Sequence, residues 1–260
     1  MATLTTTRLG GKLAGKNVLL IGGTAGIGLA VARGALQEGA HITISSSSSD
    51  KVTKSVEQLR ADFPSDNVNH IRGYKADLSI KAQIESAVDG LLSYAANGST
   101  IDHIVFTAGN SLSMKPLSEC TVDDLEALLV VRFYGAVAVA KYAEKYMKKE
   151  KTSSITLTTG AQSYKPSIWA APAIGSAVEG LMRGLAVTLA PIRVNTVSPG
   201  FVKTDLSSGM PQAAIDKWVA GTLVKDCGHP EEVAEAYLYF MKDNFVTGTE
   251  LATNGGAYLA

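Results

Sequence analysis

The chain has few cysteines, no net charge and no long apolar run, and each absence excludes a class of protein. Only Cys120 and Cys227 are cysteines among 260 residues, and they stand too far apart for a metal or redox motif. We therefore expect free thiols in a reducing compartment, and no metal site. Lysine plus arginine equal aspartate plus glutamate at 24 each, without a basic stripe, which argues against nucleic acid or an anionic membrane as the main partner.

No uncharged apolar stretch is long enough to cross a membrane, and residues 1–11 lack the apolar core of a signal peptide. We expect a flexible N-terminal arm over residues 1–12 and a cytoplasmic location. The remaining residues, 13–260, fit one large α/β domain in length and apolar content. A small molecule is therefore the expected partner.

The most informative stretch is residues 18–28, where four apolar residues precede a glycine-rich turn and a helix pattern. Strand, glycine turn and helix form the phosphate-binding unit of a doubly wound sheet. Glycines let the backbone approach a pyrophosphate, and the helix N-terminus offers free N–H groups and a partial positive charge. The residues that we expect at the pyrophosphate are Gly22, Thr24, Ala25, Gly26, Ile27 and Gly28. A tight turn without a ligand is the alternative.

The spacing Gly22-x-x-x-Gly26-x-Gly28 resembles the signature of the short-chain dehydrogenase/reductase (SDR) family, with Ile21 in place of its leading threonine. The resemblance extends over nearly the whole chain. It implies an α/β fold: a single-domain, Rossmann-type, doubly wound parallel sheet with helices on both faces. It also implies a nicotinamide cofactor and pairing into tetramers or dimers through helices expected at residues 121–148 and 167–189.

The second expected strand, residues 41–44, is followed by five serines and no acid. In NAD-binding sheets an acid here takes the ribose 2′-hydroxyl, and it would repel a 2′-phosphate. The hydroxyls of Ser45, Ser46 and Ser47 and the charge of Lys51 favour that phosphate instead. We therefore predict NADP(H) rather than NAD(H); a merely flexible serine loop is the alternative.

Further cofactor contacts follow from the resemblance alone. Asp77 and Leu78 align with a pair that contacts adenine, although Asp77 could also cap a helix. Thr107-Ala108-Gly109 aligns with a turn beside the cofactor, with Phe106 and Thr107 replacing two asparagines. The remaining contacts are expected beside the nicotinamide amide and pyrophosphate, at Pro199, Gly200, Val202 and Thr204.

The catalytic positions depart from the family pattern. The family's tyrosine and lysine, a general acid and the ammonium that lowers its pKa, fall on Ala171 and Gly175, which carry no proton. The catalytic serine falls on Thr158 or Thr159. Arg132 stands where the family has a catalytic asparagine. Reduction of a ketone through a tyrosyl proton is therefore excluded.

The losses are similar to those in a branch of fungal SDR-like enzymes that make bridged indole alkaloids of the malbrancheamide and paraherquamide type. These enzymes reduce an iminium with NADPH and guide an intramolecular Diels–Alder reaction. Arg132 and Trp169 match the branch, but Lys165 precedes Pro166 where the branch has a catalytic aspartate. Tyr164 and Lys165 are then the fallback proton donors, and residues 206–224 the substrate lid.

Three functions remain open from the sequence. The first is an NADPH-dependent reductase of an iminium, imine or activated carbonyl that also guides a [4+2] cyclisation, with Arg132 facing an anionic oxygen and Trp169 shaping the pocket. The second is a non-redox isomerase or cyclase that keeps NADP as a structural cofactor. The third is a binding protein on an inactive SDR scaffold, because a fold does not determine a function.

Overall fold

The computed structural model describes residues 11–64, 70–110 and 115–260. The predicted arm lies mostly outside these residues. The seven strands are β1 (Asn17–Ile21), β2 (His41–Ser46), β3 (Ile71–Lys75), β4 (His103–Phe106), β5 (Ser154–Thr158), β6 (Arg193–Pro199) and β7 (Glu250–Thr253). The α-helices are α1 (Gly26–Gln37), α2 (Ser49–Asp62), α3 (Ile84–Ala96), α4 (Val122–Leu129), α5 (Gly135–Tyr146), α6 (Ala170–Thr188), α7 (Gln212–Ala220) and α8 (Pro230–Lys242).

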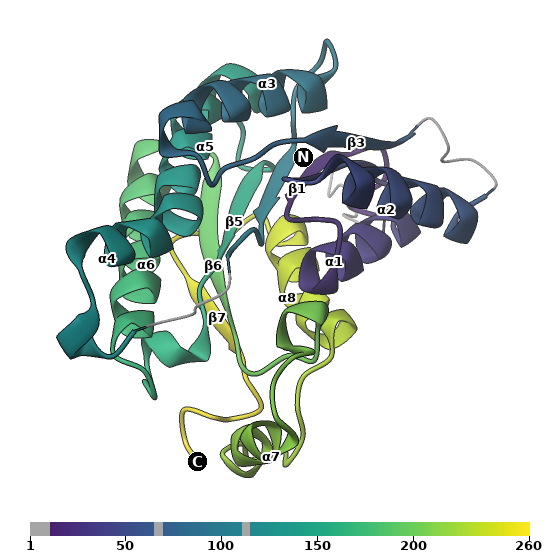
Figure 1. Ribbon diagram of the computed structural model, residues 1–260. Coiled ribbons are helices and arrows are strands. Elements are labelled where there is room, and N and C mark those ends of the chain that lie inside the picture. Colours follow the sequence, from purple (N-terminus) through teal and green to yellow (C-terminus); the bar gives the residue numbers. More distant parts are fainter. Residues whose placement is uncertain (1–10, 65–69, 111–114) are drawn as a thin grey trace, which may run out of the picture.

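All strand pairs are parallel, and the sheet order is β3-β2-β1-β4-β5-β6-β7 (Figure 1). The chain runs outward from β1 in one direction and then returns to continue from β4 in the other. The strand order therefore reverses between β1 and β4, which is where doubly wound sheets bind ligands. The predicted fold class is confirmed.

Helices cover both faces of the sheet, and each face has its own apolar core. Residues of α1, α2 and α8 pack on one face around strands β1 and β2. Residues of α3, α5 and α6 pack on the other. Strands buried on both faces read as continuous apolar runs, which explains why residues 18–21 were informative in the sequence.

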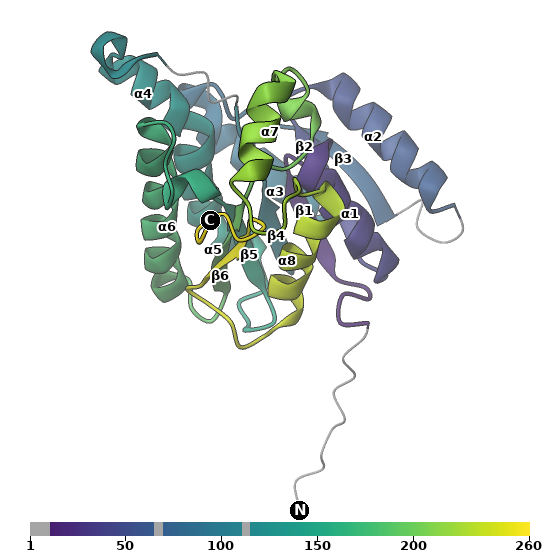
Figure 2. The ribbon, with the colours of Figure 1, turned by 90° about the horizontal axis from the view of Figure 1, so that it is seen from below.

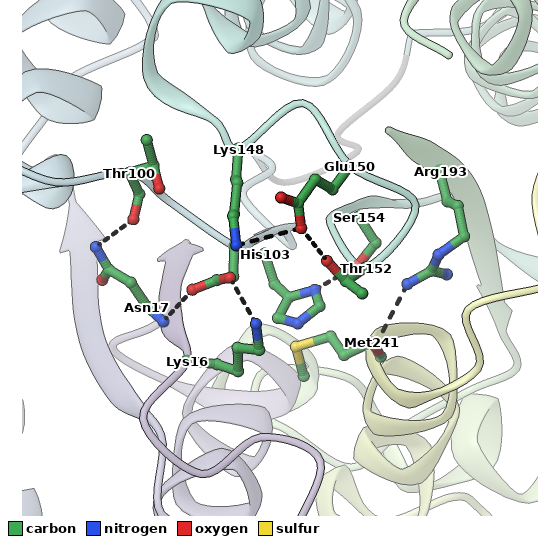
Figure 3. A network of polar contacts seen from close by, with 11 residues as sticks. Lys16, Asn17, Thr100, His103, Lys148, Glu150, Thr152, Ser154, Arg193 and Met241 are labelled. Atoms are coloured by element: carbon green, nitrogen blue, oxygen red, sulfur yellow. Dashed lines mark hydrogen bonds and ion pairs between the residues drawn. The ribbon is translucent and has the colours of Figure 1, made fainter. Parts of the chain in front are cut away.

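Polar contacts join the amino ends of β1, β4 and β5, at the end of the sheet opposite the glycine turn (Figure 3). Lys16 forms an ion pair with Asp102, whose other carboxylate oxygen accepts the Asn17 backbone N–H. His103 Nδ1 lies 2.9 Å from the Ser154 hydroxyl in the adjoining strand. Burial lowers the pKa of His103 to about 3, so the imidazole is neutral at neutral pH. This edge is built for stability rather than chemistry.

The helix expected over residues 121–148 is present without a gap from Val122 to Tyr146, with a π-helical turn in its middle. Thr121 caps α4 through a reciprocal capping box with Asp124, as its sequence position favours. A π-helical turn, Val130–Tyr134, then separates α4 from α5. Such turns insert one extra residue and commonly occur at functional sites. None of the helices in the described ranges is long and apolar enough to span a membrane.

Candidate active site

The glycine turn after β1 is pressed against the turn after β4. Gly22 has a φ of +90°, and a Cβ there would lie 2.6 Å from the Ala108 backbone nitrogen. A Cβ on Gly28 would lie 2.3 Å from the Gly22 carbonyl oxygen and 2.5 Å from Thr107 Oγ1. Both positions therefore require glycine. The structure brings the two predicted cofactor turns together at the topological switch point.

Thr107 stands where the family turn has an asparagine, and its hydroxyl makes a hydrogen bond to the turn after β1. Its hydroxyl lies 3.3 Å from the Ile21 carbonyl and 3.2 Å from the Gly22 carbonyl, and its N–H donates to Ile21 at 2.8 Å. A short side chain can thus connect the turns after β1 and β4. The sheet keeps a side-chain hydrogen bond at this point.

Residues after β6 complete the same edge of the sheet. A Cβ on Gly26, whose φ is +50°, would lie 3.0 Å from Thr204 Cγ2, so the predicted pair is in close proximity. Gly200 donates its N–H to the Thr253 carbonyl, and a Cβ there would lie 2.8 Å from Asn254 Cα. Val202, in contrast, is buried in the core under α1 and α8.

The start of α1 fits a pyrophosphate. Its N-cap, Ala25, makes no side-chain capping bond, and no acid stands in the first turn. The first N–H groups of this helix consequently keep their hydrogen-bonding capacity for an anion. Together with the glycines that admit no Cβ, this geometry is suited to the diphosphate of a dinucleotide. Thr24 and Ile27 lie in the same turn and are half-buried.

The serine run divides into buried and exposed residues. Ser45 is 1% exposed, and its carbonyl accepts the N–H groups of Gly22 and Gly23. Its hydroxyl is therefore removed from a phosphate at the surface. Ser46 is half-buried and Ser47 is exposed at the carboxyl end of β2, where the described chain carries no acid before Asp50. These two serines remain the predicted 2′-phosphate ligands.

Asp77 and Leu78 lie beyond the end of β3. Asp77 accepts the backbone N–H and the hydroxyl of Ser79, and these bonds lower the pKa of its carboxyl. It closes a turn rather than capping a helix, since the next short helix is capped at Ile80. Leu78 is buried in the core under α3.

Arg132 lies in the π-helical turn and reaches the turn after β4. Its guanidinium donates to the Asn110 side-chain oxygen at 2.8 Å and to the Asn110 carbonyl at 2.7 Å. A Cβ on Gly109 would lie 2.5 Å from this guanidinium, so the cation rests flat on the Gly109 backbone. Burial lowers the pKa of Arg132, and in the described part of the chain no carboxylate pairs with it. The site therefore contains an uncompensated cation.

The two threonines at the end of β5 face opposite ways. Thr158 donates to the Phe106 carbonyl at 2.7 Å and lies 2.7 Å from the Tyr237 hydroxyl, on the α8 side. Thr159 lies 3.0 Å from Glu250 Oε2 and 3.3 Å from the Val197 carbonyl. Since these bonds direct Thr158 into the core, Thr159 is the better candidate for the serine position.

The positions of the missing acid pair are filled. Ala171 and Gly175 are buried on α6. A Cβ on Gly175 would lie only 1.6 Å from Ser163 Oγ. The Ser163 hydroxyl thus occupies the space through which a lysine side chain would have to leave the helix. The chain has lost the lysine and has also closed its exit.

The loop before α6 is held from two sides. Trp169 Nε1 donates to the Lys115 carbonyl at 3.4 Å. Lys165 donates to the Ala260 carbonyl, and the Tyr164 ring lies 4.7 Å from the Tyr258 ring. In the lid range, α7 has no buried residue and stands beyond the carboxyl ends of the strands (Figures 1 and 2). Trp218 on α7 stacks over Phe201.

Four site residues escaped the sequence analysis: Asn110, Ser163, Tyr237 and Glu250. Asn110 follows Gly109 directly and Ser163 ends a three-residue 3-10 helix, so neither carries a pattern. Tyr237 reads as part of an apolar helix face. Glu250 had one usable signal, a lone acid in a strand that otherwise reads as apolar or small.

Comparisons with known proteins agree with this geometry. Residues 9–260 match the model of the SDR-like Rossmann domain, so the chain belongs to the SDR family of oxidoreductases. The family generally binds NAD(H) or NADP(H), and the resemblance found in the sequence is confirmed.

Among its relatives are two fungal short-chain dehydrogenase/reductases. The chain is 40% identical to malC of Malbranchea aurantiaca over 95% of this chain and 96% of the relative. It is 38% identical to ucsE of an Acremonium species, over 98% and 99%. The solved structure of the MalC reductase/Diels–Alderase superposes with a TM-score of 0.92 at 39% identity, over 97% and 100% of the two chains. A metagenomic blue fluorescent protein solved with NADPH has a TM-score of 0.81 at 26% identity, over 96% and 100%.

Proposed function

We propose that this protein is an NADP(H)-dependent reductase of secondary metabolism that acts on an iminium or imine carbon and guides an intramolecular [4+2] cyclisation of an indole alkaloid. The observation that carries the proposal is the pairing of an intact dinucleotide cradle with a filled lysine position. Similarity to a reductase/Diels–Alderase supports it. The bound cofactor supplies a hydride.

The chain's own residues bind and orient. Gly22, Gly26 and the start of α1 hold the diphosphate, while Ser46 and Ser47 contact the 2′-phosphate. An iminium carbon is already electrophilic, so no tyrosyl proton is needed. Arg132 holds an anionic oxygen of the substrate by charge-assisted hydrogen bonds in a partly desolvated site. A pocket shaped by Trp169 and the lid restricts the reactant to a near-attack conformation.

The decisive experiment pairs two probes. Purified protein with NADPH is given N-methyl-3,4-dihydroisoquinolinium, which needs only a hydride, and acetophenone, which also needs a proton on oxygen. We expect NADPH to be consumed with the iminium and not with the ketone. Reduction of the ketone at a comparable rate would contradict the proposal.

Arg132 and Trp169 are tested on the cyclisation. With a prenylated indole dienophile–diene precursor, Arg132→Gln and Trp169→Ala should change the product ratio or the stereochemistry. A product formed equally well with NADP⁺, or without cofactor, would instead favour the non-redox cyclase. That alternative draws its support from the same filled lysine position. Tight NADPH binding without turnover of any probe would favour a binding protein.

A further inference from the structure

The hydroxyl of Thr159 lies beside the carboxyl of Glu250, which has Glu179 of α6 and the buried Thr196 of β6 as neighbours. Thr159 Oγ1 lies 3.0 Å from Glu250 Oε2. Glu250 begins β7, and the carboxyl of Glu179 on α6 lies near enough to raise the pKa of the Glu250 carboxyl. Two carboxylates in proximity repel each other, which favours a proton on one of them.

The surroundings of Glu250 favour that proton. Burial raises the pKa of the Glu250 carboxyl most, and the charge of Glu179 raises it further. The hydrogen bond from Thr159 and the charge of Arg183 act in the opposite direction. The Tyr258 phenol faces the same pair from the C-terminal segment. Since the two carboxyl groups are coupled, the proton belongs to the pair.

A second, independent observation lies in the sheet beside Glu250. Thr196 is the register partner of Glu250, is fully buried, and its hydroxyl has no hydrogen-bond partner among the described residues. Paired residues of neighbouring strands point to the same face, so this hydroxyl lies on the Glu250 side. Buried hydroxyls are normally satisfied, and water is the usual partner where protein offers none. The Thr196 hydroxyl therefore marks a polar position beside Glu250 that the described protein atoms leave unsatisfied.

We propose that Glu250 and Thr159 form a proton relay that delivers a proton to the substrate nitrogen, a role that rests on the proposed reductase function. A bound nicotinamide would supply the hydride to the imine carbon, and the C=N π electrons would move to nitrogen. The Glu250 proton passes to Thr159 Oγ1, and the hydroxyl proton of Thr159 passes to nitrogen. The Glu250 carboxylate regains its proton from water. Amine forms, and hydride donor plus one proton are consumed.

The geometry gives Thr159 the freedom this step needs. Its hydroxyl lies 3.3 Å from the Val197 carbonyl, so with Glu250 protonated its hydrogen can point to that carbonyl or to a substrate atom. Thr159 follows β5 at the carboxyl edge of the sheet, the edge that also carries Arg132 and the glycine turn. The relay thus supplies the proton that the family's tyrosine and lysine provide and that Ala171 and Gly175 cannot.

The test uses a matched pair of substrates. The neutral imine 3,4-dihydroisoquinoline needs a proton and a hydride, whereas its N-methyl iminium needs only a hydride. Glu250→Gln should lower kcat for the imine at least about tenfold and leave the iminium within about twofold. Thr159→Val should do the same, and Thr159→Ser should restore imine turnover. Glu235→Gln, a carboxylate on α8, is the control. Equal losses on both substrates, or none, would overturn the relay.

A readout without substrate separates this proposal from the reductase proposal. Infrared titration of the free protein should show a protonated carboxyl band above the ordinary glutamate pKa of about 4.3, absent in Glu250→Gln. Glu179→Gln should move its midpoint downward. If the wild type reduces neither probe, the reductase proposal fails, while the band still decides whether Glu250 holds a proton. Absence of the band overturns the relay in either case.

Discussion

At the scale of single residues, the site is defined by what each position excludes. Gly109 admits the Arg132 guanidinium because it has no Cβ, and Gly175 admits Ser163 for the same reason. Gly109 thus leaves space for a cation, whereas the space beside Gly175 that a lysine side chain would need is filled by Ser163. A site that keeps its cofactor cradle while making both changes is consistent with the proposed substrate, which would present an anionic oxygen to Arg132 and would not use the family's tyrosyl proton.

The proposed selectivity for NADPH is tested at Ser46. Ser46→Asp should weaken NADPH binding about tenfold, because a carboxylate at the end of β2 repels a 2′-phosphate by about 1–2 kcal/mol. NADH binding should be unchanged or improved. The check is a fluorescence titration with both cofactors. Ser46→Ala is the control and should cost NADPH less. An unchanged NADPH affinity in Ser46→Asp would place the 2′-phosphate elsewhere.

Gly175 tests whether Ser163 closes the lysine exit. Gly175→Ala should lower the free energy of unfolding by about 1–3 kcal/mol, because the new Cβ overlaps Ser163. Adding Ser163→Gly should recover part of that loss, a coupling that urea unfolding of the four proteins measures.

Gly180→Ala on the same helix is the matched control, since open space surrounds a Cβ there and alanine is the better helix former. It should be neutral or stabilising. A neutral Gly175→Ala would refute the closure. With closure intact, Ala171→Tyr with Gly175→Lys should not restore ketone reduction.

At the scale of elements, the sequence predicted those helices and strands whose pattern lies in consecutive residues. Residues 18–28 predicted β1, its glycine turn and α1, because burial on both faces and glycine spacing are written in consecutive residues. The π-helical turn between α4 and α5 was missed, since residues 130–134 carry no proline or glycine before Gly135. Ser163 and Glu250 were missed because each acts through a contact with a distant segment. Pattern reading does not resolve such contacts.

Burial of His103 on β4 makes stability depend on pH. Its pKa is about 3 in the fold against 6.5 in the unfolded chain, so the unfolded chain binds the extra proton. Stability from this group is complete above pH 6.5 and is lost as pH falls toward 3, by about 1.4 kcal/mol per pH unit. Urea unfolding between about pH 4.5 and 6.5 measures the slope, and comparison with a His103 variant separates it from the effects of Glu250, whose pKa is raised, and His41, whose pKa is lowered.

His103→Asn should flatten that slope, since an amide can still pair with Ser154 and does not titrate. The variant itself should be less stable at neutral pH because the ring volume is lost. His229→Asn, an exposed helix cap, should keep the wild-type slope. An unchanged slope in His103→Asn would mean that another group controls the acid side.

At the scale of the whole molecule, the two ends of the parallel strands carry different kinds of residues. The carboxyl ends of the strands gather the glycine turn, Arg132, Thr159 and the predicted lid. The opposite edge holds His103 and the Lys16–Asp102 ion pair, which link strands and reach no cofactor turn. Substitutions at the second edge should therefore change stability with little effect on cofactor affinity.

The oligomeric state is predicted from two exposed valines on neighbouring helices and from the family resemblance. Val187 on α6 is 80% exposed and Val137 on α5 is 41% exposed. These helices lie on the same side of the sheet (Figure 1). The family resemblance predicts pairing through this side, so light scattering should give two or four times the 27.2 kDa chain mass. Val187→Asp should then lower the mass, because a carboxylate buried without a partner costs several kcal/mol. In a monomer the same substitution would stay within about 0.5 kcal/mol of wild-type stability. A single-chain mass for the wild type would contradict the predicted oligomer, and it would leave Val187 as an ordinary exposed residue.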